Sequence, residues 1–254
     1  MVYYVTYKAS EEPKNMSRVP RRLRGLGCEQ IRKSFWEVNE EKIKTVAELL
    51  QKNSPVILKR AREIRKPSFT KGGRRSELGS LIVIAYRVPK EEKKVKIVNL
   101  LKRAPCIRLC RGVYAFCQQH ERFDRTHRLV GARSFWKFIR EIDENAVMIP
   151  RLIVVSNRSV ERLLEETRKR VEKEVGNIVE GYGHLYQKVK KGETDGRHAA
   201  GTAQKLRKRF VIARKVAAFY EEWLRMDLSN ILAKPYPTKR KVRSLIYEKY
   251  GTTY

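Results

Sequence analysis

The chain has 254 residues, of which 58 are lysine or arginine and 28 are aspartate or glutamate, so its formal net charge is +30. Hydrophobic residues make up 41% of the chain, which excludes the composition of a disordered tail, and no stretch approaches the roughly 20 apolar residues of a membrane span. So large an excess of positive charge would repel itself in a compact fold, and it therefore predicts an anionic partner.

The positive charge is spread along the whole chain. Residues 1–75 carry a net charge of +11, residues 76–196 of +9 and residues 197–254 of +10. Because nucleic acid is the polyanion present in every cell, this distribution favours nucleic-acid binding, with an anionic membrane as the weaker alternative. A second alternative is the salt-laced surface of a heat-adapted protein, but there Glu should keep pace with Lys and Arg, and here it does not.

The ends and the cysteines bear on the cellular compartment. The apolar run from Met1 to Val5 follows no basic segment and has no cleavage site, so we expect a strand and not a signal peptide. Four cysteines in a long basic chain indicate reduced thiols and a cytoplasmic protein. Cys106 and Cys110 would lie roughly 13 Å apart on a strand at ~3.3 Å per residue, too far to share a metal ion, and no phosphate-binding Gly-rich loop is present. We therefore expect no metal and no other cofactor.

The first 64 residues predict a domain with the order β-α-β-(β)-α-β. Alternating apolar residues predict strands, and apolar residues at helical spacing predict helices. The elements expected are a strand at 2–8, a basic helix at 18–26 closed by Gly27, a strand at 31–38, a helix at 41–52 and a strand at 56–58. A fourth strand near residues 37–39 is too short to define.

A linker and a second copy follow. Residues 65–79 contain Pro67, Gly72 and Gly73 and predict a flexible, solvated connection. The order of elements then repeats over residues 80–156. The elements expected there are a strand at 81–87, a basic helix at 91–103, a strand at 107–117, a helix at 134–142 and a strand at 152–155.

The two copies align at a nearly constant offset. Tyr7-Lys8 corresponds to Tyr86-Arg87 at an offset of 79, and Ser34 corresponds to Gly112 at an offset of 78. A repeated offset supports an internal duplication. The expected fold class is therefore α/β (α+β), with two tandem ferredoxin-like βαββαβ units that cover each other, sheet to sheet, as an internal pseudo-dimer.

Residues 157–254 predict a helical C-terminal region. Apolar residues over 160–189 recur at spacings of three, four or seven, and a second such stripe covers 206–224 after a break at 190–197. We expect these helices to form an antiparallel hairpin packed on the sheet domain. Pro235 and Pro237 are expected to stop the second helix, and Thr238 to cap a last short one.

The motifs of the first copy resemble a known family. Tyr4-Val5-Thr6-Tyr7-Lys8-Ala9-Ser10, the basic helix ending at Gly27, and Ile31-Arg32-Lys33-Ser34-Phe35-Trp36 are similar to the small CRISPR adaptation family, Cas-two. The second copy, with Ile84-Ala85-Tyr86-Arg87-Val88-Pro89 and the helical hairpin through Glu221-Glu222-Trp223-Leu224, resembles the N-terminal region of chromate-resistance regulators. Both resemblances imply the ferredoxin-like unit, and the second implies duplex DNA binding and transcriptional control.

One departure from the Cas-two pattern bears on activity. That family carries an aspartate at the end of strand one, proposed as the metal-binding group of a nuclease. Here Lys8 and Arg87 occupy this position in the two copies. A cation cannot ligate a divalent metal, but it can contact a phosphate oxygen. We therefore expect a non-catalytic protein, with a metal-dependent nuclease as a disfavoured alternative.

The candidate phosphate contacts are basic residues at the strand ends, on the helices and in the linker. They are Lys8, Arg21, Arg22, Arg24, Arg32, Lys33, Arg74, Arg75, Arg87, Arg111, Lys205, Arg207, Lys208, Arg209 and Arg214. The expected role is a DNA-binding regulatory protein. RNA or ribosome binding is the alternative, because double-stranded RNA is also recognised largely by shape. A protein partner could bind exposed sheet edges.

Overall fold

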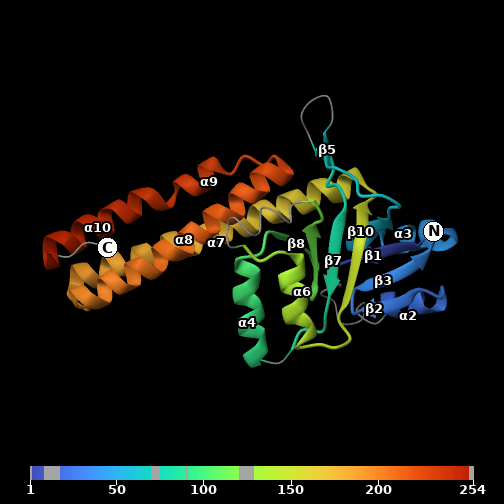
Figure 1. Ribbon diagram of the computed structural model, residues 1–254, viewed down its shortest axis with the longest axis horizontal. Helices are drawn as coiled ribbons and strands as arrows, with labels where there is room; N and C mark the ends of the chain where they lie inside the picture. The colour runs from blue at the N-terminus through green and yellow to red at the C-terminus, as the bar shows by residue number, and fades with distance from the viewer. Residues whose placement is uncertain (1, 9–17, 70–74, 90, 120–128, 252–254) are drawn as a thin grey trace. The chain divides into compact units, whose positions relative to one another are not determined.

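The computed structural model describes residues 2–8, 18–69, 75–89, 91–119 and 129–251 (Figure 1). The chain divides into two compact units, Met1–Glu165 and Glu166–Tyr254, and helix α7 (Asn157–Lys191) runs across the boundary. The fold is mixed α+β, with the strands in the first unit and helices alone in the described part of the second. Within the described ranges, no helix has both the length and the apolar composition needed to cross a bilayer.

We call residues 1–64 the first repeat and residues 80–156 the second, after the copies expected from the sequence. The first repeat contains two strands where one was expected over residues 31–38. Lys33 and Ser34 form a turn there, and residues near 37–39 belong to the second strand of the hairpin. The apolar pattern hides this turn because it contains no Gly, Pro or Asn. The elements are β1 (Val2–Thr6), α2 (Arg18–Gly25), β2 (Glu29–Arg32), β3 (Phe35–Asn39), α3 (Ile43–Leu49) between two short 3-10 turns (Glu40–Lys42 and Gln51–Asn53), and β4 (Val56–Arg60).

The second repeat has the same order of helices and strands as the first. Here too the structure contains two strands where the sequence predicted one. The strand expected over 107–117 is a hairpin that turns at Arg111 and Gly112. The elements are β7 (Leu81–Ala85), α4 (Glu91–Lys102), β8 (Cys106–Cys110), β9 (Val113–Cys117), α6 (Ala132–Arg140) and β10 (Val147–Val154). The segment expected to be an unstructured linker contains a short two-stranded sheet, β5 (Ser68–Phe69) with β6 (Arg75–Glu77).

The strands of both repeats join one antiparallel sheet. Among the described residues this sheet has eight strands in the order β2-β3-β1-β4-β10-β7-β9-β8. Each repeat contributes four neighbouring strands, and the last strand of one repeat, β4, pairs with the last strand of the other, β10, with Lys59 opposite Ile153. The sequence did not predict this joint between the two copies.

Strand β10 bends between its two partners. Val147 to Ile149 pair with β7, as does Leu152 after a shift in register, and Leu152 to Val154 pair with β4 on the other side. At the bend, Arg151 has a φ of 60°, its backbone N–H donates to Gln118 Oε1 at 2.8 Å, and its Nη1 donates to the Arg62 carbonyl at 2.9 Å. A bent strand of this kind lets one sheet change direction and form a corner.

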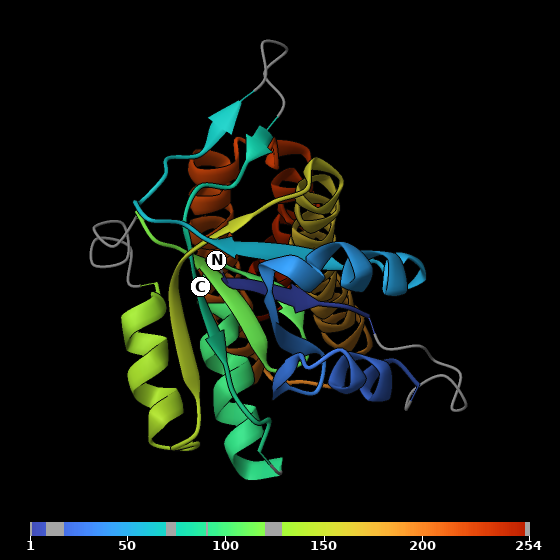
Figure 2. The same ribbon diagram turned by 90° about the vertical axis from the view of Figure 1, so that its right-hand side faces the viewer.

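The sheet folds back on itself at this corner. Strands β2 and β8 are at its opposite edges, yet the thiol of Cys110, at the end of β8, donates to the carbonyl of Ser34, in the turn after β2, at 3.8 Å. Figure 2 shows the blue helices α2 and α3 on one side of the strands and the green helices α4 and α6 on the other.

Both faces of the strands carry apolar side chains. On the helix-covered faces, Val5 and Trp36 pack with Leu23 of α2, and Ile84 packs with Phe135 of α6. On the opposite faces, the buried side chains are Tyr4, Phe35, Leu58, Leu81, Val83 and Val113. Burial on both faces explains why β7 reads as a continuous apolar run.

The described part of the second unit consists of three long helices and one short one. Helix α7 is followed by α8 (Gly196–Leu224), α9 (Ser229–Ala233) and α10 (Pro235–Tyr250). Tyr182, Phe210 and Val242, one each from α7, α8 and α10, share one buried core. The two apolar stripes predicted from the sequence are confirmed as the buried or half-buried faces of α7 and α8.

The expectation that Pro235 and Pro237 end a helix is wrong. They lie at the start of α10, where Pro is well tolerated because the first backbone N–H groups have no intrahelical acceptor. Helix α10 is consequently longer than the short terminal helix expected. Its other end is closed by Gly251, at a φ of 63°, whose N–H donates to the Tyr247 carbonyl at 2.8 Å.

Candidate nucleic-acid interface

The predicted strand-end cations occupy matching places in the two repeats. Tyr7 N–H donates to the Ser34 carbonyl at 3.4 Å, and Tyr86 N–H donates to the Gly112 carbonyl at 2.8 Å. The residues aligned by offset in the sequence therefore make the same backbone contact in both copies. Lys8 and Arg87 follow these tyrosines with exposed side chains.

Each strand end is fixed by the loop that follows the second helix of its repeat. In the first copy, Lys8 N–H donates to the Asn53 carbonyl at 3.0 Å, and Asn53 Nδ2 donates to the Lys8 carbonyl at 3.3 Å. In the second copy, Arg87 N–H donates to Asp143 Oδ2 at 2.7 Å. The Asp143 carboxylate thus lies at the end of β7.

Arg32 binds protein groups. Its Nη2 donates to Asp143 Oδ2 at 3.3 Å and to the Asn145 carbonyl, and its Nη1 donates to the Ile31 carbonyl at 2.7 Å. The side chains of Arg32 and Asp143 are only 20% and 12% exposed. Arg32, predicted as a phosphate contact, instead ties the end of β2 to the loop between α6 and β10.

The other candidates of the first unit lie on α2 and at the hairpin turns. Arg21, Arg22 and Arg24 are exposed on α2, and Arg24 donates to Gln30 Oε1 at 2.7 Å. Lys33 and Arg111 are exposed in the two turns that the contact between Ser34 and Cys110 brings together. Arg74 lies outside the described residues, and of Arg75 only the backbone, in β6, is described.

On α8 the predicted basic run separates into two kinds of residue. Lys205, Arg207, Lys208 and Arg214 are exposed. Arg209 is half-buried and forms a two-pronged ion pair with Glu174 of α7, with Nε–Oε1 at 2.6 Å and Nη2–Oε2 at 3.1 Å. The hydrogen bonds to Glu174 raise the pKa of Arg209. Arg209 therefore links α7 to α8.

Four cations from α8 and α10 gather into one cluster. Burial lowers the pKa of Lys239, and the neighbouring positive charges of Arg207, Arg243 and Arg214 lower it further. We call Arg207, Arg214, Lys239 and Arg243 the α8–α10 cluster. Among the described residues, the guanidinium groups of its three arginines have no carboxylate partner.

The α10 half of the cluster was missed in the sequence. Lys239 and Arg243 are four residues apart, and Arg207 and Arg214 are seven apart, so each pair lies on one face of its helix. This spacing could have identified both pairs. It was overlooked because α10 was expected to be a short helix after a proline stop.

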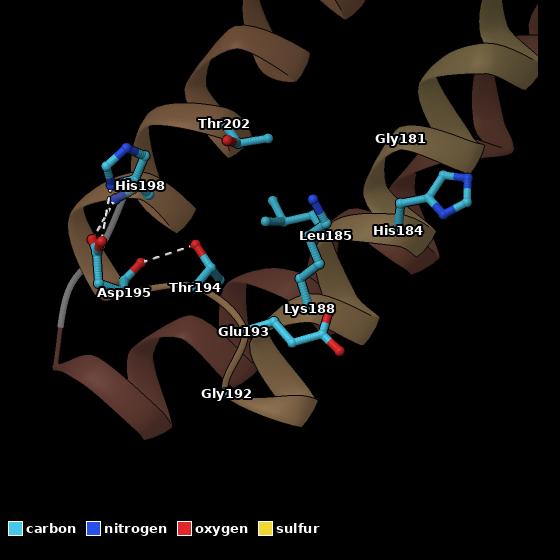
Figure 3. Close-up of a pocket in the computed structure, with 10 residues that line it drawn as sticks. All are labelled: Gly181, His184, Leu185, Lys188, Gly192, Glu193, Thr194, Asp195, His198 and Thr202. Atoms are coloured by element: carbon cyan, nitrogen blue, oxygen red, sulfur yellow. Dashed lines mark hydrogen bonds and ion pairs between the residues drawn. The ribbon is translucent and has the colours of Figure 1, made fainter.

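A shallow groove lies at the turn between α7 and α8 (Figure 3). On one side, Asp195 accepts a hydrogen bond from His198 N–H at 2.8 Å, and its other oxygen lies 2.9 Å from His198 Nδ1. On the other side, His184 of α7 points away from this pair. Asp195 and His198 are largely exposed, so the pair caps α8 and does not enclose a reaction site.

The remaining titratable groups do not assemble a metal centre within the described ranges: no three His, Cys, Asp or Glu side chains there are placed to hold an ion. Cys28, Cys106 and Cys117 are buried, and burial raises the pKa of Cys110 to about 12.

Comparison with known proteins found no matching family model, no similar curated protein and no similar solved structure.

Proposed function

We propose that this chain is a non-catalytic nucleic-acid-binding protein and that the α8–α10 cluster contacts phosphates. The observation that carries the proposal is the convergence of three arginines on Lys239. Among the described residues, the guanidinium groups of Arg207, Arg214 and Arg243 have no carboxylate partner. Side chains of like charge held together raise the free energy of the folded protein, and a polyanion bound across them would relieve that repulsion. Release of counterions from the polyanion would add to the affinity.

The specific form of the proposal is a DNA-binding regulatory protein of the cytoplasm, with RNA or ribosome binding as its alternative. The resemblance to regulators favours duplex DNA, whereas phosphate contacts suit either polymer. In this proposal the two repeats are ferredoxin-like units of one internal pseudo-dimer, as their identical strand order supports, and α7 and α8 form the helical hairpin. Lys8 and Arg87 at the strand ends weigh against a nuclease of the Cas-two type.

The proposal is tested by measuring affinity against salt concentration for the full chain and two matched variants. Arg207→Gln removes a cluster charge, and Arg209→Gln removes the same charge two residues away, from the pair with Glu174. We expect Arg207→Gln to make the plot of log affinity against log salt shallower by about 0.9 on duplex DNA, the value for one phosphate contact. Arg209→Gln should leave this slope unchanged.

Adding Arg243→Gln to Arg207→Gln should double the change in slope, because the two guanidiniums come from different helices and would contact different phosphates. Parental slope and affinity in this double variant would refute the phosphate-binding role of the cluster. The same titration with duplex RNA selects the polymer. Magnesium-stimulated cleavage that a carboxylate substitution abolishes would refute the non-catalytic part.

A further inference from the structure

An aromatic side chain lies at the edge of the α8–α10 cluster. Tyr236, in the first turn of α10, is 38% exposed, and its ring packs at 82° against the ring of Phe210, with centroids 5.5 Å apart. Phe210 is buried in the core of the second unit and stands in α8 between Arg207 and Arg214. The ring of Tyr236 is therefore held against a fixed neighbour beside the cations.

Basic and apolar side chains share the helix faces that carry this ring and its neighbour Phe210. Lys239 and Arg243 follow Tyr236 by three and seven residues and lie on its side of α10. On α8, Val211 is 43% exposed between the two arginines of the cluster. The surface thus offers a partly exposed aromatic ring and a methyl-rich side chain among positive charges.

This combination distinguishes between paired and unpaired nucleic acid. In a duplex the bases stack on one another, and a protein ring at the surface meets only the backbone. In a single strand the bases are free to stack on aromatic side chains while cations follow the phosphates. A ring already packed against Phe210 loses little conformational freedom when a base stacks on it.

We propose that the α8–α10 cluster binds an unpaired nucleic-acid strand, with one base stacked on Tyr236 and the neighbouring phosphates on Arg207, Arg214 and Arg243. This inference rests on the phosphate-binding role proposed above and replaces its preference for a duplex with an unpaired strand. Stacking uses the face of the base and not the sugar, so the surface would accept a single strand of either RNA or DNA.

The test compares binding of the full chain to a labelled 20-nucleotide oligo-dT, the matching oligo-U, and a dA·dT duplex of the same length, near physiological salt. Tyr236→Leu keeps an apolar side chain against Phe210 but removes the aromatic face, and Tyr236→Phe keeps the face but removes the hydroxyl. We expect Tyr236→Leu to weaken binding to both single strands about fivefold or more and to change duplex binding less than twofold. Tyr236→Phe should bind like the parent.

The outcomes separate this inference from the proposed function. If Tyr236→Leu binds single strands like the parent while Arg207→Gln with Arg243→Gln weakens binding, the stacking inference is wrong and the phosphate-binding role stands. If neither variant changes binding, both are wrong. An equal loss on duplex and single strands in Tyr236→Leu, with an unchanged melting temperature, would also overturn the preference for an unpaired strand.

Discussion

Gly112, in the turn between β8 and β9, is a position where the backbone accepts only glycine. It adopts a φ of 78°, and a Cβ atom there would lie 2.4 Å from the carbonyl oxygen of Tyr86. The Gly112 carbonyl also accepts the N–H of Tyr86 at 2.8 Å. Both the left-handed backbone and the close approach therefore require glycine.

Gly112→Ala is expected to lower the free energy of unfolding by about 2 kcal/mol or more, because both strain and a backbone clash are introduced. Gly25→Ala is the matched control in the same unit, since a Cβ at Gly25 meets nothing within 4 Å and its φ is not positive. The free energy of unfolding of both variants is measured by urea denaturation, with circular dichroism as the signal. Equal midpoints for the two variants would contradict the role assigned to Gly112.

Asp195 caps the N-terminus of α8, and the stability of this cap depends on pH. Hydrogen bonds from the backbone N–H and the ring of His198 lower its pKa from the ordinary 3.8. A carboxyl group whose pKa is lower in the folded state adds stability above the unfolded pKa, and that stability is lost as the pH falls through the folded pKa. We expect Asp195→Ala to lower the melting temperature at pH 7.

The difference in melting temperature between Asp195→Ala and the parent should shrink as the pH is lowered below 3.8, because protonation removes the acceptor in the parent as well. Scanning calorimetry from pH 7 to pH 3 follows this difference. A gap that stays constant over the range would mean that the carboxylate charge contributes nothing to the cap.

At the scale of elements, the loop between α6 and β10 connects the two repeats. Asp143 accepts hydrogen bonds from Arg32 of β2, from Arg87 N–H after β7, and from Asn145 N–H at 3.1 Å. One carboxylate thereby joins a strand end of the first copy to a strand end of the second.

Asp143→Ala should destabilise the protein by about 2 kcal/mol, because it removes an acceptor from a half-buried guanidinium and from two backbone N–H groups. Glu144→Ala is the control, because its side chain is exposed and, among the described residues, only its backbone carbonyl accepts a hydrogen bond, from Arg140. Chemical denaturation compares the two. A loss in the control as large as that in Asp143→Ala would assign the effect to the loop backbone.

Periodicity in the sequence identified the elements that bury one continuous face. The helices around Val175 and Ala217 and the buried run from Leu81 to Ala85 follow from apolar spacing alone. Local chemistry was a poorer guide to chain reversals. The turn at Lys33 and Ser34 contains no Gly, Pro, Asn or Asp. Pro235 starts a helix because its missing N–H would have no intrahelical partner there in any case.

The sequence predicted the α8 half of the cluster and not the α10 half. Spacing identifies which residues share a face of one helix, so Arg207 and Arg214 were recognised. Which helix packs beside α8 depends on the shared core of Phe210 and Val242, which no local pattern encodes. Glu174, the ion-pair partner of Arg209, is likewise distant in sequence. The sequence therefore could not show which basic residues of α8 bind a carboxylate and which do not.

At the scale of the whole molecule, the charge of +30 determines how stability responds to salt. Screening weakens repulsion between like charges, and it also weakens attractive surface ion pairs. In this chain repulsion dominates, because Lys and Arg outnumber Asp and Glu by 58 to 28.

The melting temperature of the protein without nucleic acid is therefore expected to rise between 20 and 300 mM NaCl at pH 7, by several degrees on the order expected for a change of 1–2 kcal/mol in stability. Repeating the scan with KCl separates screening from sodium binding. A fall in melting temperature over this range would favour the alternative of a heat-adapted surface held together by ion pairs.

The sharing of β10 by both halves of the sheet also sets an order of events during synthesis on the ribosome. Arg60 in β4 pairs with Leu152, so one edge of the first repeat has no partner until the last strand of the second repeat has emerged. Because a ribosome adds about 5–20 residues per second, the backbone N–H and C=O groups at this edge of β4 have no strand partner for several seconds. The nascent first repeat is in this interval a half-finished sheet that can pair with other chains. Crowded translation of this protein should consequently favour exchange of β10 between neighbouring copies.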